Sequence, residues 1–155
     1  MIKLDIGSGM AHNNDGWIGV DPFSKEANLR DYMWCLSFED ETVDMIYSSH
    51  SLEHVEKTKV MPTLKEWYRV LKQDGVVILR VPDLVWCCKH FIEYQSTGWD
   101  MDVIFGHQAT AGEFHHTGFT EKILKDYCTN AGFLITKFEE LNTHGQKTLS
   151  IELKK

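Results

Sequence analysis

The sequence predicts an α/β fold with a mostly parallel sheet, and three features of the chain support this. Short, nearly continuous apolar runs alternate with amphipathic segments of helical period, as in parallel sheets that helices cover. A Gly-Ser-Gly turn follows the first apolar run, at the edge where such sheets place a ligand. The last two apolar runs flank a short polar turn and indicate an antiparallel hairpin at one side of the sheet.

The expected strands are apolar runs that stop at a glycine, an acid or a proline. The clearest is "GVVILRV", which stops at Pro82. In chain order, strands are predicted at residues 2–6, 16–21, 42–48, 75–81, 133–141 and 148–153.

The expected helices lie between these runs and show an apolar residue at every third or fourth position. Thr120 is suited to cap the last of them, because its hydroxyl can accept a hydrogen bond from a backbone N–H of the first turn. No repeat or Pro/Gly-rich linker divides the chain, so we expect a single domain over residues 1–155. Helices are predicted at residues 60–72, 84–95 and 120–131.

Composition limits the partners and the compartment. The chain has 155 residues, of which 43% are hydrophobic, and a formal charge of −7, which disfavours a phosphate-binding nucleic-acid surface. Its four cysteines form no C-x-x-C pair, which is typical of a reduced protein. No signal peptide and no apolar run of membrane-spanning length is present. We therefore expect a cytoplasmic protein that binds neither nucleic acid nor membrane.

The segment "LDIGSGMA" combines a strand, an acid and a glycine-rich turn. The glycines let the backbone turn sharply and approach an anionic or polar ligand. A dinucleotide fingerprint would need a third glycine at position 12, which is His12, so a nicotinamide cofactor is disfavoured. Asp21 ends the second strand, where a carboxylate could accept the ribose hydroxyls of an adenosine or simply form a turn with Pro22.

The stretch "YSSHSLEHV", residues 47–55, contains the letters H-x-x-E-H. His50 and His54 would be zinc ligands in an inverted zinc peptidase, with a long helix around the motif and a further glutamate in a larger chain. The same stretch also follows a strand-like run, where it would end a strand and begin a helix beside a ligand. The second interpretation suits this short chain better, and we expect no metal site.

Taken together, five ordered motifs resemble those of the class I S-adenosylmethionine-dependent methyltransferases, and within them the small branch found among polysaccharide biosynthesis genes. The first two, "KLDIGSG" and "GWIGVDP", cover the glycine turn and the following acid. "LSFEDETVDMIYSSHSLEHV" and "EWYRVLKQDGVVILRVPD" resemble the central motifs, and "HHTGFTEKILKDYCTNAGF" resembles the last. The resemblance covers nearly the whole chain.

This resemblance implies a Rossmann-like, three-layer α/β/α sandwich that binds S-adenosyl-L-methionine. The implied activity is transfer of its methyl group to a hydroxyl or amine of a small-molecule or glycan-type acceptor. The glycine turn and the first acid would hold the methionine end, and the later acids and their neighbours the adenosine. The implied cofactor-binding residues are Asp5, Gly7, Ser8, Gly9, Asp21, Pro22, Asp31, Tyr32, Ser48 and Ser49.

A hydroxyl acceptor would need a base, for which histidine is suited near neutral pH. The candidates are His50, His107 and His115, of which His115 matches the histidine of the family's H-x-x-G-F motif. We expect the 97–118 loop to cover the substrate side of the cleft and to place His107 and His115 near the transferable methyl group. A role in the loop structure alone stays open for each histidine.

A second interpretation is a non-catalytic module that binds S-adenosylmethionine or a partner. The chain starts at its first strand, without the leading helices that cover the cofactor in larger relatives, and its first crossover is short. Ser37 and the pair Gln73–Asp74 also replace residues usual in the family. The intact glycine turn favours the enzyme instead, and a homodimer could help to close its site.

Overall fold

The computed structural model describes residues 1–9, 16–95, 98–143 and 145–155. These residues form one six-stranded sheet in the order β2-β1-β3-β4-β6-β5. The strands are β1 (Lys3–Ile6), β2 (Ile18–Val20), β3 (Val43–Ser49), β4 (Leu71–Pro82), β5 (Leu134–Thr143) and β6 (Gln146–Lys154). The helices are η1 (Leu52–His54), α1 (Lys57–Val70), α2 (Leu84–Tyr94), α3 (Trp99–Phe105) and α4 (Glu121–Asn130).

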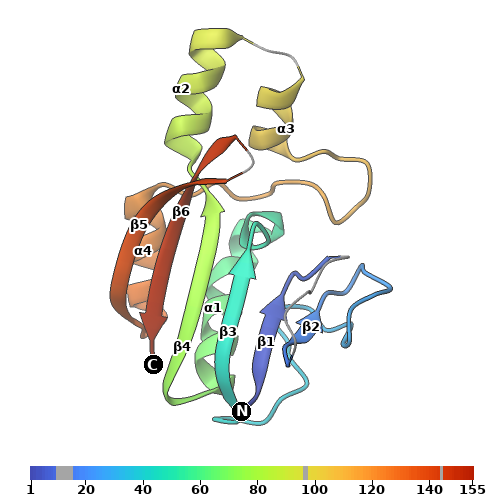
Figure 1. Cartoon of the computed structure of the whole chain (residues 1–155), viewed down its shortest axis with the longest axis vertical. Helices are drawn as coiled ribbons and strands as arrows, with labels where there is room; N and C mark the ends of the chain where they lie inside the picture. Colours follow the sequence, from blue (N-terminus) through green and yellow to red (C-terminus); the bar gives the residue numbers. More distant parts are fainter. Residues whose placement is uncertain (10–15, 96–97, 144) are drawn as a thin grey trace.

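The strand directions confirm the predicted α/β fold. Strands β2, β1, β3 and β4 run parallel, and β4 then pairs with β6 in the antiparallel sense. Strands β5 and β6 form the antiparallel hairpin expected at the end of the chain. The carboxyl ends of the parallel strands point to the upper end of the molecule, and both termini lie at the opposite end (Figure 1).

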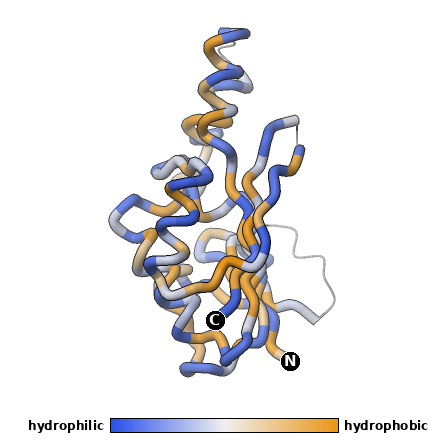
Figure 2. The backbone as a smooth tube through the Cα atoms, turned by 90° about the vertical axis from the view of Figure 1, so that its left-hand side faces the viewer, coloured by the Kyte–Doolittle hydropathy of each residue, from blue (hydrophilic) through white to orange (hydrophobic). Residues whose placement is uncertain are grey.

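Helices α1 and α4 cover one face of the sheet and enclose the core with it (Figures 1 and 2). The predicted apolar face of α1 is buried, with Val60, Leu64 and Trp67 inaccessible to solvent. Burial of a Leu or Val side chain contributes roughly 1.5–3 kcal/mol, so this layer is the main source of stability. The side chains of Tyr47 and Arg80, from β3 and β4, remain half-buried.

Two elements differ from the sequence prediction. Helix α1 begins at Lys57 and contains Pro62 as its sixth residue, so that the missing N–H removes only one internal hydrogen bond. Helix α3 was expected as loop. The predicted short crossover at residues 11–16 and the absent glycine at His12 concern positions that, apart from Gly16, fall outside the described residues. In the described part of the chain no helix is long and apolar enough to cross a membrane.

The four cysteines divide into two accessible and two enclosed thiols. Burial raises the pKa of Cys87 to about 12, with a smaller contribution from the nearby Asp83 carboxylate, and burial alone raises the pKa of Cys128 to about 12. At pH 8 only about one in ten thousand of these thiols is ionised, and the thiolate is the reactive form. We expect a small thiol reagent at pH 8 to modify the exposed Cys35 and Cys88 but not Cys87 or Cys128.

Mass spectrometry of the reacted protein would check this, with a urea-unfolded sample as the control in which all four thiols should react. Modification of Cys128 at the rate of Cys35 in the folded protein would contradict the packing described for α4.

Candidate functional site

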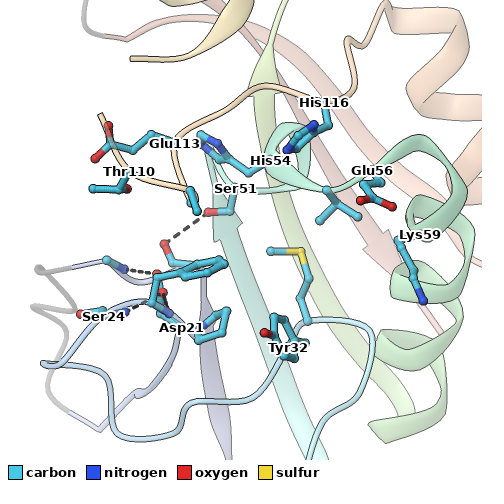
Figure 3. A pocket seen from close by; sticks show the side chains of 18 of the residues that line it. Asp21, Ser24, Tyr32, Ser51, His54, Glu56, Lys59, Thr110, Glu113 and His116 are labelled. Atoms are coloured by element: carbon cyan, nitrogen blue, oxygen red, sulfur yellow. Dashed lines mark hydrogen bonds between the residues drawn. The ribbon is translucent and has the colours of Figure 1, made fainter. Parts of the chain in front are cut away.

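A cavity of about 650 Å³ opens at the carboxyl ends of the parallel strands. The segment that follows β2 forms one wall, and residues 110–116 form the opposite wall (Figure 3). The turn after β1 and the segment from His50 to Lys59 close the space between them. This volume lies within the usual range for a site that holds a drug-sized or cofactor-sized ligand.

The glycine turn forms part of the cavity floor. Gly7 has φ of 73°, and a Cβ on it would lie 2.0 Å from Ser51 Oγ, so the backbone packs here without room for a side chain. Ser51 Oγ lies within hydrogen-bond distance of the carbonyl oxygens of Ser49 (3.1 Å) and Gly7 (3.3 Å). Ser8 Oγ is buried and has no hydrogen-bond partner among the described residues. The turn therefore lines the cavity with Gly7 and Gly9, while Ser8 lies beneath this surface.

Asp21 lies at the end of β2 and lines the cavity, as predicted. Its Oδ1 accepts hydrogen bonds from the backbone N–H groups of Phe23 (2.8 Å) and Ser24 (3.0 Å), and its Oδ2 from that of Gly9 (3.0 Å). A carboxylate offers about four acceptor positions, and the described residues occupy three of them, which leaves one on Oδ2 among these residues. Asp21 therefore both fixes the glycine turn and can still accept a hydroxyl of a ligand.

Aromatic side chains form the wall beside Asp21. Tyr32 and Trp34 are stacked with their centroids 4.8 Å apart, and Phe23 meets Tyr32 edge to face at 6.4 Å. Phe23 and Tyr32 are exposed, although aromatic rings of this size normally bury their area. With Pro22 and Met33 they give an apolar, ring-rich surface suited to a purine base.

The remaining predicted cofactor residues lie near the cavity but do not line it. Asp5 and Ser48 are buried in β1 and β3, and Ser49 ends β3. The Asp31 carboxylate accepts hydrogen bonds from the backbone N–H (2.7 Å) and the hydroxyl (3.1 Å) of Ser37. Asp31 therefore shapes the loop that carries Tyr32. Ser51, which follows β3, does line the cavity.

His50 is the predicted catalytic histidine that lines the cavity. Its φ of 52° is unusual for a residue other than glycine and turns the chain sharply after β3. Its Nε2 lies 3.2 Å from the hydroxyls of Thr143 and Thr148 on the terminal hairpin. His50 and His54 are thus not on one regular helix, and the inverted zinc-peptidase arrangement is not formed.

The other two predicted catalytic histidines, His107 and His115, do not line this cavity. His107 is 76% exposed, with Nδ1 3.3 Å from Asp102, and does not line the cavity. His115 turns inward beneath the loop, with Nδ1 3.2 Å from the Val103 carbonyl oxygen and its ring against His54. Burial lowers the pKa of His115, and the nearby Glu53 carboxylate partly opposes this. The loop reaches the cavity as predicted, but without these two side chains.

Several cavity residues were not predicted, because loop side chains follow no period that a sequence reveals. His116 faces the cavity although its neighbour His115 faces away from it. The backbone N–H groups of His116 (2.8 Å) and Thr117 (3.1 Å) both donate to the Glu53 carbonyl oxygen, which fixes this turn. The unpredicted lining residues with charged or ionisable side chains are His54, Glu56, Lys59, Glu113 and His116.

Comparisons with known proteins point to one fold family. Residues 4–79, just under half of the chain, match the model of the methyltransferase domain family. An S-adenosylmethionine-dependent methyltransferase of Methanosarcina mazei superposes with a TM-score of 0.74 at 22% identity, over 99% of this chain and 91% of that one. A comparison with curated proteins found no match.

Two further solved structures show the same similarity. An S-adenosylmethionine-dependent methyltransferase of Thermotoga maritima gives a TM-score of 0.71 at 19% identity, over 99% of this chain and 82% of that one. The 1,6-didemethyltoxoflavin-N1-methyltransferase of Burkholderia thailandensis, solved with its substrate and S-adenosylhomocysteine, gives 0.70 at 17% identity, over 99% and 70%. The fold is therefore that of the S-adenosylmethionine-dependent methyltransferases.

Proposed function

We propose that this protein binds S-adenosyl-L-methionine and transfers its methyl group to a small acceptor. The observation that carries the proposal is the meeting of the Gly7–Gly9 turn and Asp21 in one open cavity. Both lie within the segment that matches the methyltransferase domain. The uncommitted acceptor position on Asp21, the aromatic wall and the cavity volume suit an adenosine with an amino-acid tail.

In this proposal, the wall that follows β2 binds the adenosine of the cofactor. Asp21 Oδ2 accepts a ribose hydroxyl, and Tyr32 and its aromatic neighbours pack against the base. The cofactor supplies a methyl group on a sulfonium, which is already activated for transfer. The chain then has to hold the acceptor in line with that methyl group, and such positioning contributes roughly 7–11 kcal/mol.

The acceptor enters between the two walls, on the side of residues 110–116. His116 lines this side and its ring nitrogens have no hydrogen-bond partner among the described residues, so we infer that it takes the acceptor proton. His50, held by two threonine hydroxyls, orients the turn after β3. Charged groups of both signs, Glu56, Lys59 and Glu113, surround the opening and suit a polar small molecule or sugar with a hydroxyl or amine.

The test is calorimetric titration with S-adenosylhomocysteine, supported by thermal unfolding. We expect binding and a higher melting temperature for the unmodified protein. Asp21→Asn removes one charge-assisted acceptor, worth about 1.5–3 kcal/mol, so affinity should fall by about 10- to 100-fold. Asp126→Asn, which changes an exposed acid of α4, is the matched control and should bind normally.

Absence of both heat and thermal shift with S-adenosylhomocysteine, together with binding of NADH, would overturn the proposal. Binding by wild type without methyl transfer to any hydroxyl or amine compound in a broad panel would favour the non-catalytic module. A homodimer that closes the site would be detected separately, as an apparent mass that rises with protein concentration in analytical ultracentrifugation.

A further inference from the structure

A second group of ionisable side chains lies beside the cavity, where η1 meets the loop after α3. Glu53 and His54 come from η1, and His115 comes from the loop. Each of the three offers one potential ligand atom, and these atoms all lie within 4.8 Å of one another. The group therefore joins the carboxyl end of β3 to the wall that covers the acceptor side.

Glu53 is the least expected member of this group. Its side chain is only 2% exposed, and neither carboxylate oxygen accepts a hydrogen bond from the described residues. His50 Nδ1 lies 3.6 Å from Glu53 Oε1, which is beyond hydrogen-bond distance. A buried carboxylate without hydrogen bonds is costly unless a cation compensates its charge. A bound cation would compensate the charge of this carboxylate.

Both histidines are oriented in the way that metal-binding histidines usually are. His54 Nδ1 lies 3.1 Å from the Phe114 carbonyl oxygen, and His115 Nδ1 lies 3.2 Å from that of Val103. A carbonyl oxygen can only accept, so each Nδ1 carries the hydrogen and, in the neutral ring, each Nε2 keeps its lone pair. A histidine that binds a metal commonly donates its other N–H to a backbone carbonyl in this manner.

We propose that Glu53, His54 and His115 bind one divalent transition-metal ion. Two imidazoles and one carboxylate are a ligand set used for catalytic Zn²⁺ and for non-haem Fe²⁺. Bonds of about 2.0–2.2 Å need ligand atoms roughly 3.4 Å apart, so atoms that now lie within 4.8 Å of one another would approach by at most about 1.4 Å through side-chain rotations. This proposal differs from the expectation, drawn from the sequence, that the chain has no metal site, and the titration below decides between the two.

The proposed site differs from the H-x-x-E-H arrangement considered above. His50 is held by the threonines of the terminal hairpin, and His115, sixty-two residues after Glu53, takes its place. Of the three ligands only His54 lines the cavity, so the ion would lie behind the cavity wall, and three protein ligands would leave at least one coordination position open. The ion would hold the 110–116 wall against β3 and could polarise an acceptor oxygen.

The experiment uses tag-free full-length protein, stripped with a chelator and titrated with Zn²⁺ alone. We expect one equivalent to bind and to raise the melting temperature. Glu53→Gln and His115→Gln keep the shape of the site and should each weaken Zn²⁺ binding by about 10- to 100-fold or more. His107→Gln, which changes an exposed histidine outside the cluster, is the matched control and should bind as wild type.

Substitution of Co²⁺ for Zn²⁺ gives a second measurement, because its visible absorption reports nitrogen and oxygen ligands directly. The spectrum should be altered in both cluster variants and unchanged in His107→Gln. Failure of wild type to bind Zn²⁺, or equal affinity in wild type and folded Glu53→Gln, would overturn the proposal. Binding of S-adenosylhomocysteine is measured on the same stripped samples, so failure of the cofactor proposal is recognised separately.

Discussion

Replacing Gly7 with alanine is expected to lower the free energy of unfolding by about 2–5 kcal/mol and to abolish detectable binding of S-adenosylhomocysteine. The new Cβ would lie 2.0 Å from Ser51 Oγ and 2.3 Å from Ser51 Cβ, so η1 or the turn must shift. Overpacking of this kind costs about 1–3 kcal/mol, and the positive φ of 73° adds about 1–2 kcal/mol for a residue with a side chain. Urea unfolding and calorimetry measure the two effects.

Two variants separate the overlap from the backbone strain. Gly9→Ala carries a similar φ of 57°, but its Cβ would meet no atom of the described residues within 4 Å, so only the strain of about 1–2 kcal/mol is expected. Adding Ser51→Gly to Gly7→Ala removes both close atoms and should recover the overpacking part. If Gly7→Ala and Gly9→Ala are equally stable, the close packing of the turn against Ser51 is wrong.

Replacing Arg69 with methionine is expected to lower the free energy of unfolding by about 2–3 kcal/mol. Arg69 donates to both oxygens of Glu66 (2.7 and 2.8 Å), to Asp40 (2.6 Å), and to the carbonyl oxygen of Phe38 (2.9 Å). Its loss leaves Glu66, which is 15% exposed, without a countercharge. The segment that Arg69 holds, which contains Phe38 and Asp40, follows the aromatic residues Tyr32 and Trp34 of the cavity wall in the chain. We therefore expect cofactor affinity to fall as well.

The pH dependence tests the origin of this effect. The hydrogen bond from Arg69 lowers the pKa of Glu66 from 4.5. A carboxyl with a lowered folded-state pKa stabilises the fold fully above its unfolded pKa and loses this contribution as the pH falls through the folded value. The difference in the free energy of unfolding between wild type and Arg69→Met should therefore be largest near neutral pH and become smaller in acid.

Controls for this variant come from both sides of the pair. Lys122→Met breaks an exposed pair with Asp126 and should cost no more than about 1 kcal/mol. Glu66→Gln in the Arg69→Met background removes the uncompensated charge and should restore part of the stability. If Arg69→Met were as stable as Lys122→Met, the hydrogen bonds of Arg69 to Glu66, Asp40 and Phe38 would not stabilise the fold as proposed.

The fold could be predicted because most of its elements bury apolar side chains at regular spacing. The exceptions are instructive. Helix α3 buries an aspartate, Asp100, whose carboxylate lies 2.6 Å from His90 Nδ1, so its inward face carries a charge where an apolar residue signals a helix. Strand β4 begins at Leu71, directly after α1, and its pairing with β3 has a register irregularity between Val43 and Met45. The next residues of β4 are polar, so the apolar pattern of the sequence does not mark the start of the strand.

The site was predictable to the extent that it rests on backbone geometry. Asp21 and the Gly7–Gly9 turn lie in the cavity because a glycine turn and a strand end are fixed by the sheet. His115 and His116 face opposite sides because the backbone N–H of His116 is bound to the carbonyl oxygen of Glu53, sixty-three residues earlier in the chain. No local sequence pattern encodes such a contact. The histidines could therefore be identified as candidates, but the directions of their side chains could not be predicted.

The position of β6 has a consequence for how the chain is synthesised. Residues 146–154 form a strand that lies between β4 and β5, although they follow both in the sequence. Until the ribosome has released them, β4 keeps an unpaired edge and β5 has no neighbour, and open edges of this kind favour association with other chains. Nascent protein interrupted before residue 146 should therefore depend on chaperones, whereas the finished hairpin closes the sheet in one step.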